Sequence, residues 1–240
     1  DTADAESEGV EPADAVSAYH RVEQITEELG REVAHDAHAL ATLVPDLVRG
    51  NINRGWYFGR GLANGTNSLA ATWSSLVDAY TVTPQQVRND LVLRGFMSVA
   101  AELDRKQVAG FLDAAIGSPA LGPIFPVLQA VFPVDDSDVS RIIDAIRREI
   151  APINSYRFLG RGPALETISL HPLQDLIREL ASQPDGFSVA VEVFFRFLDN
   201  RQDKGQPVSG DLARAGRELL SRITFGSADS LLDYRLTGIV

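Results

Sequence analysis

The fold class is decided first by the stretch from Val16 to Val44, which reads VSAYHRVEQITEELGREVAHDAHALATLV. Its apolar side chains recur every three or four positions, the spacing that places them on one stripe of an α-helix. They are Val16, Tyr19, Val22, Ile25, Leu29, Val33, Ala37, Leu40 and Val44. Gly30 is expected to divide the stretch into two helices or to bend one, and Pro45 is expected to limit the second helix. The stretch therefore predicts amphipathic helix.

The same helical period continues along the rest of the chain. Thr83, Pro84 and Gln86 form a helix-start pattern, which predicts a helix from Pro84 to about Glu102. The segment from Val189 to Phe195 has a β-type composition, but it is predicted to be helical because its neighbours offer no partner strand. Further helices are expected at about 56–58, 69–80, 106–116, 124–131, 138–150, 153–159, 172–181, 187–198, 211–223 and 228–236. The predicted fold is all-α, with about ten to twelve short helices.

Two similar strings indicate an internal repeat. Tyr57–Gly61 reads YFGRG and Phe158–Gly162 reads FLGRG, about 100 residues later, and an apolar helical stripe follows each. Short helices that cannot bury their stripes alone are typical of a helical solenoid. We expect an acidic tail over 1–12 and one irregular helical-repeat domain over 13–240. That domain would hold N-terminal helices (13–54), a first repeat block (55–152) and a second, incomplete block (153–240), so the natural chain is expected to continue.

Three short elements carry a resemblance to known proteins. They are Gly59-Arg60-Gly61, the Trp-x-x-Leu pair of Trp73 and Leu76, and Leu93-Arg94-Gly95-Phe96. These elements are similar to helical regions of large multidomain bacterial proteins, including nucleotide-switch proteins of anti-phage defence. The string of short antiparallel-type helices from about 55 to 225 resembles HEAT or armadillo solenoids. The resemblance implies a partner-sensing or scaffold role and implies no catalytic residue.

Composition and charge narrow the classes of function. The chain of 240 residues has a formal net charge of −11, which disfavours binding to nucleic acid or to an anionic membrane surface. It contains no cysteine, so a disulfide framework, a cysteine zinc site and a thiol nucleophile are excluded, and a cytoplasmic location is expected. No apolar run is long enough to span a bilayer, and the acidic first residues do not resemble a signal peptide.

Two clusters could bind a metal. His35 and His38 are three residues apart on a predicted helix, but no further ligand is in reach, so both are predicted to be solvated. The run from Asp135 to Asp138 resembles the magnesium clusters of all-α isoprenoid synthases. It also follows Pro133 and opens a helix, which favours a helix cap. The alternative function is an all-α magnesium-dependent enzyme that uses these aspartates.

The Gly-Arg-Gly strings raise the question of an anion site. The string at Gly59 lacks the lysine and the glycine spacing of a phosphate loop, so its glycines are predicted to be turn residues between two helices. Arg60 and Arg161 occupy matching positions, where each is expected to bind helix-end carbonyls or a neighbouring carboxylate, the alternative being a ligand anion. No serine-hydrolase elbow or His-Glu-x-x-His motif is present.

The resulting hypothesis is a non-catalytic protein-interaction, scaffold or sensor domain of a larger protein. Its expected partner is another protein or another domain of the same chain, with no catalytic residue, cofactor or metal. A helical regulatory region that signals to an attached NTPase remains a further alternative.

Overall fold

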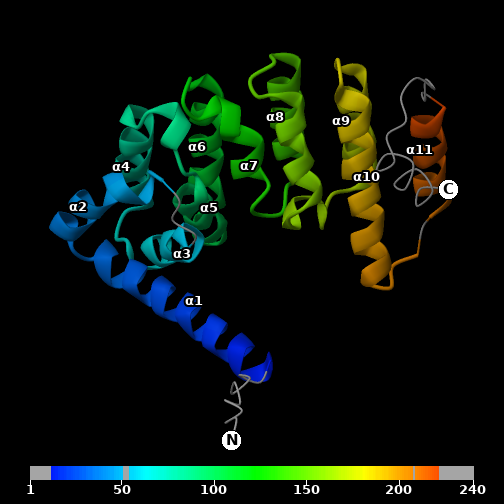
Figure 1. Ribbon diagram of the computed structural model, residues 1–240. Coiled ribbons are helices and arrows are strands. Elements are labelled where there is room, and N and C mark those ends of the chain that lie inside the picture. Colours follow the sequence, from blue (N-terminus) through cyan, green and yellow to red (C-terminus); the bar gives the residue numbers. More distant parts are fainter. Residues whose placement is uncertain (1–11, 51–53, 208, 222–240) are drawn as a thin grey trace, which may run out of the picture. The chain divides into compact units, whose positions relative to one another are not determined.

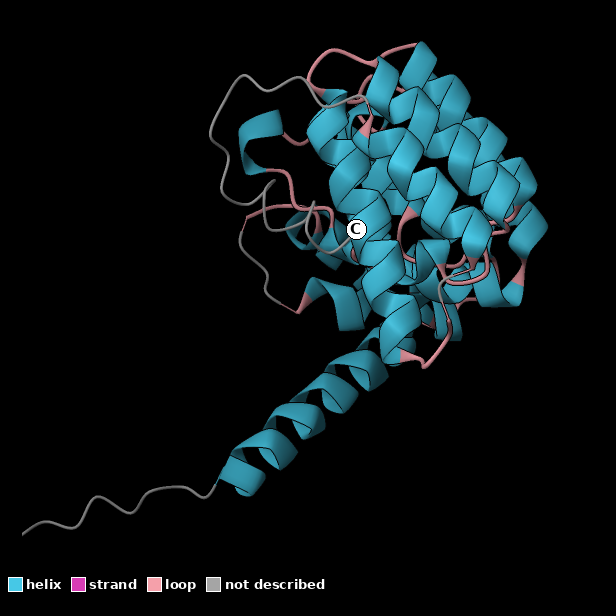
Figure 2. Cartoon of the chain, turned by 90° about the vertical axis from the view of Figure 1, so that its right-hand side faces the viewer, coloured by secondary structure: helices cyan, strands magenta, loops and turns pink. Residues whose placement is uncertain are grey.

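The computed structural model describes residues 12–50, 54–207 and 209–221, with side chains from Tyr19 onward (Figure 1). All regular structure in this part of the chain is helical, which confirms the predicted all-α class (Figure 2). None of the described helices has both the length and the apolar character needed to cross a membrane. The helices are α1 (Pro12–Ala34), α2 (Ala37–Leu47), α3 (Gly55–Gly65), α4 (Leu69–Val82), α5 (Leu91–Leu103), α6 (Arg105–Gly117), α7 (Phe125–Gln129), α8 (Asp136–Arg147), α9 (Leu170–Ser182), α10 (Gly186–Asp203) and α11 (Gly210–Leu220). Short 3₁₀ helices are η1 (Gln85–Val87), η2 (Gly122–Ile124), η3 (Ile153–Gly160) and η4 (Pro163–Leu165).

The chain divides into two compact units. The first unit comprises residues 1–79 and 83–96, and the second comprises residues 80–82 and 97–240. The first unit therefore holds α1, α2, α3, most of α4 and the first turns of α5. The second unit holds the rest of α5 and the helices from α6 onward.

Glycines allow the helices of the first unit to approach closely. Gly59 and Gly61 lie inside α3, so the prediction that they form a turn was wrong. A Cβ atom on Gly61 would lie 1.9 Å from the Glu27 carbonyl oxygen of α1, and one on Gly59 would lie 2.1 Å from the Val92 carbonyl oxygen of α5. Gly30 does not break α1, because its missing side chain makes room for the Phe58 carbonyl oxygen, 2.3 Å from the ideal Cβ position. These glycines allow the backbones of α1, α3 and α5 to come into close contact.

Two other helix boundaries differ from the prediction. The helix expected to start at Pro84 starts at Leu91. The Thr83 hydroxyl donates to the Ala79 carbonyl at 2.8 Å at the end of α4, and Pro84 has extended backbone and precedes only the short 3₁₀ helix η1, so neither residue begins an α-helix. The Asn89 side chain instead accepts a hydrogen bond from the Leu91 N–H at 2.9 Å. Pro45 lies within α2, which continues to Leu47, so the expectation that it limits this helix was also wrong.

Trp73 lies in the core of the first unit, as its stripe predicts. Its side chain is buried and stacks on Phe96 of α5, with the ring centroids 5.9 Å apart. In the second unit, α10 contains the segment from Val189 to Phe195, so its predicted helical structure is confirmed. Val189, Val191 and Val193 are all buried. A helix buried on most sides needs no polar face, which explains the β-type composition.

Candidate protein-interaction surface

The structure places Arg60 against a carboxylate. Its Nε donates to the Glu27 Oε2 at 3.0 Å, which links α3 to α1. Asn64, one turn further along α3, donates to the other oxygen of Glu27 at 3.1 Å. A ligand anion at Arg60 would therefore have to compete with Glu27 for the guanidinium.

Arg161 also pairs with a carboxylate, in the second unit. Arg161 and Arg157 each donate to one oxygen of Glu192, both at 3.0 Å, and Arg157 also donates to the Ser188 hydroxyl. The Glu192 side chain is completely buried in α10, so the two guanidinium groups balance a charge that would be costly alone. The string around Arg161 spans the end of η3 and a turn, whereas the string around Arg60 is α-helical, so the two similar strings adopt different structures.

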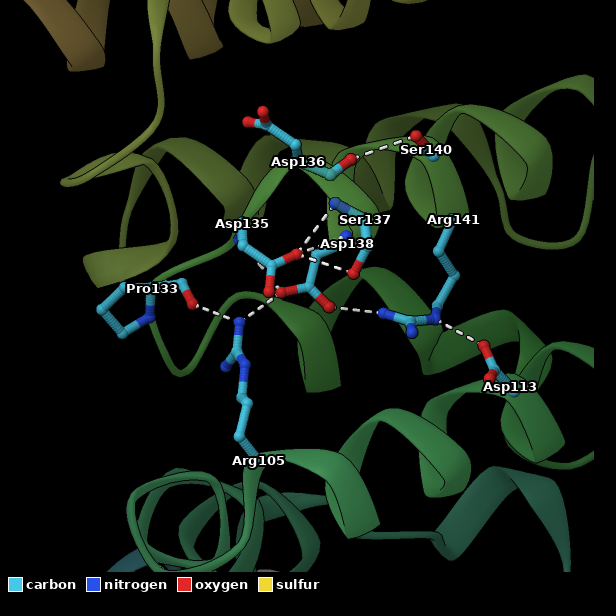
Figure 3. Close-up of polar contacts among 9 residues, drawn as sticks. All are labelled: Arg105, Asp113, Pro133, Asp135, Asp136, Ser137, Asp138, Ser140 and Arg141. Carbon is cyan, nitrogen blue, oxygen red and sulfur yellow. Dashed lines mark hydrogen bonds and ion pairs between the residues drawn. The ribbon is translucent and has the colours of Figure 1, made fainter.

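The aspartate run caps α8, as predicted (Figure 3). The Asp135 carboxylate accepts from the N–H groups of Ser137 and Asp138, both at 2.9 Å, and the Asp138 carboxylate accepts from the Asp135 N–H at 3.1 Å, which completes a capping box. Burial alone would raise the Asp135 pKa, but the hydrogen bonds from Asp138 and Ser137 outweigh it and hold the pKa below its usual value. Asp136 points away from this arrangement.

Two arginines hold the buried Asp138. Arg105 pairs with one carboxylate oxygen and Arg141 with the other (Figure 3). Arg105 also donates to the Pro133 carbonyl at 2.6 Å, and Arg141 reaches Asp113 at 2.6 Å. Both oxygens of Asp138 are thus engaged by side chains of the second unit.

The two close histidines are exposed, as predicted. His35 lies in the turn after α1 and His38 in the first turn of α2, so they do not share one helix as expected. Asp36 between them caps α2, and hydrogen bonds from the N–H groups of Ala39 and His38 lower its pKa. Among the described residues, no three acidic or histidine side chains converge in a geometry suited to a metal ion.

The face of α1 that packs on α3 is polar. Glu23 accepts a hydrogen bond from the Tyr57 hydroxyl, Glu27 pairs with Arg60, and Gly30 lies against the backbone of α3. The hydrogen bond to Glu23, helped by burial, raises the pKa of Tyr57 to about 12. The same bond lowers the pKa of Glu23. Side chains of this contact line an open groove of about 280 Å³.

The apolar face of α1 is exposed. Tyr19, Val22, Ile25 and Leu29 have 56, 36, 58 and 50% of their surface accessible. Val22, Ile25 and Leu29 share one side of the helix and form the α1 apolar stripe, whereas Tyr19 lies nearer the polar face, with the Arg54 guanidinium 5.8 Å from its ring centroid. At 100° per residue, Val22, Ile25 and Leu29 lie roughly 130° around the helix from the polar face that contacts α3. The sequence identified this stripe, but it gave no sign that α1 would pack through its glutamates and glycine instead.

Comparisons with known protein families, with characterised proteins and with solved structures find no match to this chain.

Proposed function

We propose that the chain is a non-catalytic protein-interaction domain of a larger protein, and that it binds its partner through the α1 apolar stripe. The observation that carries the proposal is the exposure of three large apolar side chains, Val22, Ile25 and Leu29, on one face of one helix. Single exposed apolar residues are normal on protein surfaces, but contiguous ones mark interaction sites. The polar face of α1 is already engaged by Tyr57 and Arg60, so the stripe is the face left for a partner.

The energy available to the stripe bounds the affinity. Complete burial of a Val, Leu or Ile side chain contributes about 1.5–3 kcal/mol. The three side chains of the stripe are about half exposed, so covering all three contributes roughly 2–4.5 kcal/mol. Association itself costs at least about 4 kcal/mol in lost rigid-body freedom. Binding through the stripe is therefore weak unless the partner makes further contacts beside it.

A helical-repeat architecture is part of the proposal. In the second unit, α9 packs on α8, α10 and α11, so neighbours along the chain are neighbours in space (Figure 1). Such stacking supports an irregular solenoid-like array, whose surface suits a scaffold. The engagement of Asp135 and Asp138 by the helix cap and by arginines favours this role over the magnesium-dependent enzyme.

Site-specific photo-crosslinking tests the proposal in cells that produce the complete protein. A photoreactive phenylalanine analogue at position 25, in the stripe, is compared with the same analogue at the exposed Asp78 of α4, in the same unit. The expected result is a discrete protein adduct from position 25 and none from position 78. If position 25 gives no adduct, or if both positions give the same adducts, the proposal is wrong.

A further inference from the structure

The geometry of α1 points to a second copy of this chain as the partner of the α1 apolar stripe, with the two α1 helices paired antiparallel about a two-fold axis. This inference rests on the proposed function, because it names the occupant of the same surface. Two features of α1 support it: the spacing of the stripe and the two charges beside it.

The stripe has the spacing of a coiled-coil seam. Val22, Ile25 and Leu29 are separated by three and then four residues, which corresponds to positions a, d and a of a heptad. The helix extends from Pro12 to Ala34, so the stripe lies within continuous helix. In an antiparallel pair, an a residue of one helix packs beside a d residue of the other, so Val22 of each copy meets Ile25 of the other.

The charges beside the stripe are self-complementary in that register. Arg21 and Glu28 are exposed and are seven residues apart, each directly before an a position. When Val22 lies opposite Ile25 of the second copy, Arg21 lies opposite Glu28 of the second copy, and the two-fold axis generates the same pair again. Within the single chain, Glu28 pairs with Arg31 at 3.0 Å. Both side chains are about half exposed, and ion pairs between exposed side chains are weak, so Glu28 is free to pair with Arg21 of a second copy.

A parallel pair offers no such match. There Arg21 would face Thr26 of the second copy, and Glu28 would face Val33. The antiparallel arrangement is therefore the one that the charges select. In the antiparallel arrangement both copies use the same surface, so no copy has an unused binding surface left over. The arrangement therefore yields a dimer and not a filament.

Other occupants fit the stripe less well. An anionic membrane surface would have to accept Glu23, Glu27 and Glu28 beside it, on a chain whose formal net charge is −11. A helix from a different protein would need an opposite charge pair in the same register, whereas a second copy supplies that pair by symmetry. The net charge of each copy opposes dimerisation at low salt, so the test is made near physiological ionic strength, where exposed charges are screened beyond about 8 Å.

Sedimentation equilibrium of the purified chain tests the inference from about 1 µM to about 1 mM, the range expected for a weak dimer. The wild type should convert from monomer to dimer across this range. Arg21→Glu should weaken dimerisation about tenfold, because it replaces two attractive pairs by two repulsive ones. Glu28→Arg should weaken it similarly. The double variant Arg21→Glu/Glu28→Arg, whose total charge equals that of the wild type, should restore it.

A second variant separates the seam from any other contact surface. Ile25→Glu combined with Leu29→Glu should keep the chain monomeric at all concentrations, with the same circular dichroism spectrum as the wild type because both positions are exposed. A wild type that stays monomeric, a double glutamate variant that still dimerises, or a charge swap that fails to restore the dimer would each overturn the inference. If the wild type is monomeric but position 25 crosslinks to a different protein, self-pairing is wrong and the proposed function stands. If there is neither dimer nor adduct, both are wrong.

Discussion

Gly61→Ala tests the close contact that sets the orientation of α1. The added Cβ would lie 1.9 Å from the Glu27 carbonyl oxygen and 2.8 Å from the Arg31 nitrogen, both main-chain atoms that cannot swing away. Ordinary contact begins near 3.4 Å, so the helices must separate by about 1.5 Å at this point. That separation also stretches the 3.0 Å hydrogen bond between Arg60 and Glu27.

The expected loss of stability is the sum of three effects. Forced overpacking costs about 1–3 kcal/mol, and a weakened hydrogen bond between the helices costs about 0.5–1.5 kcal/mol. Alanine is better than glycine inside a helix by about 1 kcal/mol, which offsets part of this. The net free energy of unfolding should therefore fall by about 2 kcal/mol.

Denaturant unfolding measures the change in the relevant unit. Trp56 and Trp73 are the two tryptophans of the chain, and both belong to the first unit, so intrinsic fluorescence follows that unit. The matched control is Gly110→Ala in α6, where an added Cβ meets nothing within 4 Å. It should stabilise the second unit by up to about 1 kcal/mol, measured by circular dichroism. If Gly61→Ala stabilises the first unit as the control stabilises the second, the close packing of α1 on α3 is refuted.

Three further predictions concern the core and the helix cap. Trp73→Ala should lower the free energy of unfolding by about 3–5 kcal/mol, and an unchanged denaturation midpoint would mean that Trp73 is exposed. Asp135→Ala should lower the free energy of unfolding by about 0.5–2 kcal/mol because it removes the cap of α8, whereas Asp136→Ala should change it little. If thermal melting shows equal losses of stability for the two variants, Asp135 is not the cap. The pKa of Asp135 in the folded chain lies below its usual value of 3.8. The charged Asp135 carboxylate therefore stabilises the fold fully above about pH 3.8, and this stabilisation is lost as the pH falls through the lower pKa of the folded chain. Asp135→Asn keeps the cap but has no carboxylate to titrate, so its free energy of unfolding should depend less on pH below about pH 4 than that of the wild type. If the two proteins lose stability identically between about pH 4 and pH 2, Asp135 is not the cause of the acid sensitivity.

The helical class and several local features could be predicted because their causes are local. The apolar period identifies α1 and α4, and the polar run before α8 identifies its cap. The sequence was also sufficient for the segment from Val189 to Phe195, since its neighbours offered no partner strand. In each case the deciding residues lie within a few positions of one another.

The glycines of α3 show why the helical structure around Gly59 and Gly61 was not predicted. Glycine weakens an isolated helix, so Gly59 and Gly61 suggested a turn, and only the approach of α1 and α5 outweighs that preference. The available signal was spacing: Gly55 and Gly59, and Gly61 and Gly65, are each four residues apart, which places each pair on one helix face.

The partners of Arg60 and Arg161 could not be predicted from the sequence for a different reason. Glu27 is 33 residues from Arg60, and Glu192 is 31 residues from Arg161. A choice between a carboxylate of the chain and a ligand anion depends on how distant helices pack. The cap pattern at Thr83 failed because the same hydroxyl serves the end of the preceding helix.

Thiol reactivity tests most directly the claim that α1 presents its apolar stripe to a partner. The chain has no cysteine, so Ile25→Cys, Leu29→Cys and Val33→Cys each introduce a single thiol on the same helix. The rate of modification is measured in dilute solution, where the chain is monomeric, and is divided by the rate in denaturant to remove intrinsic differences between the thiols. The thiols at 25 and 29 should react nearly as fast as in the denatured chain. The thiol at the buried position 33 should react at least about tenfold more slowly. Protection at 25 and 29 equal to that at 33 would show that the stripe is covered within the monomer and therefore is not a surface for a partner.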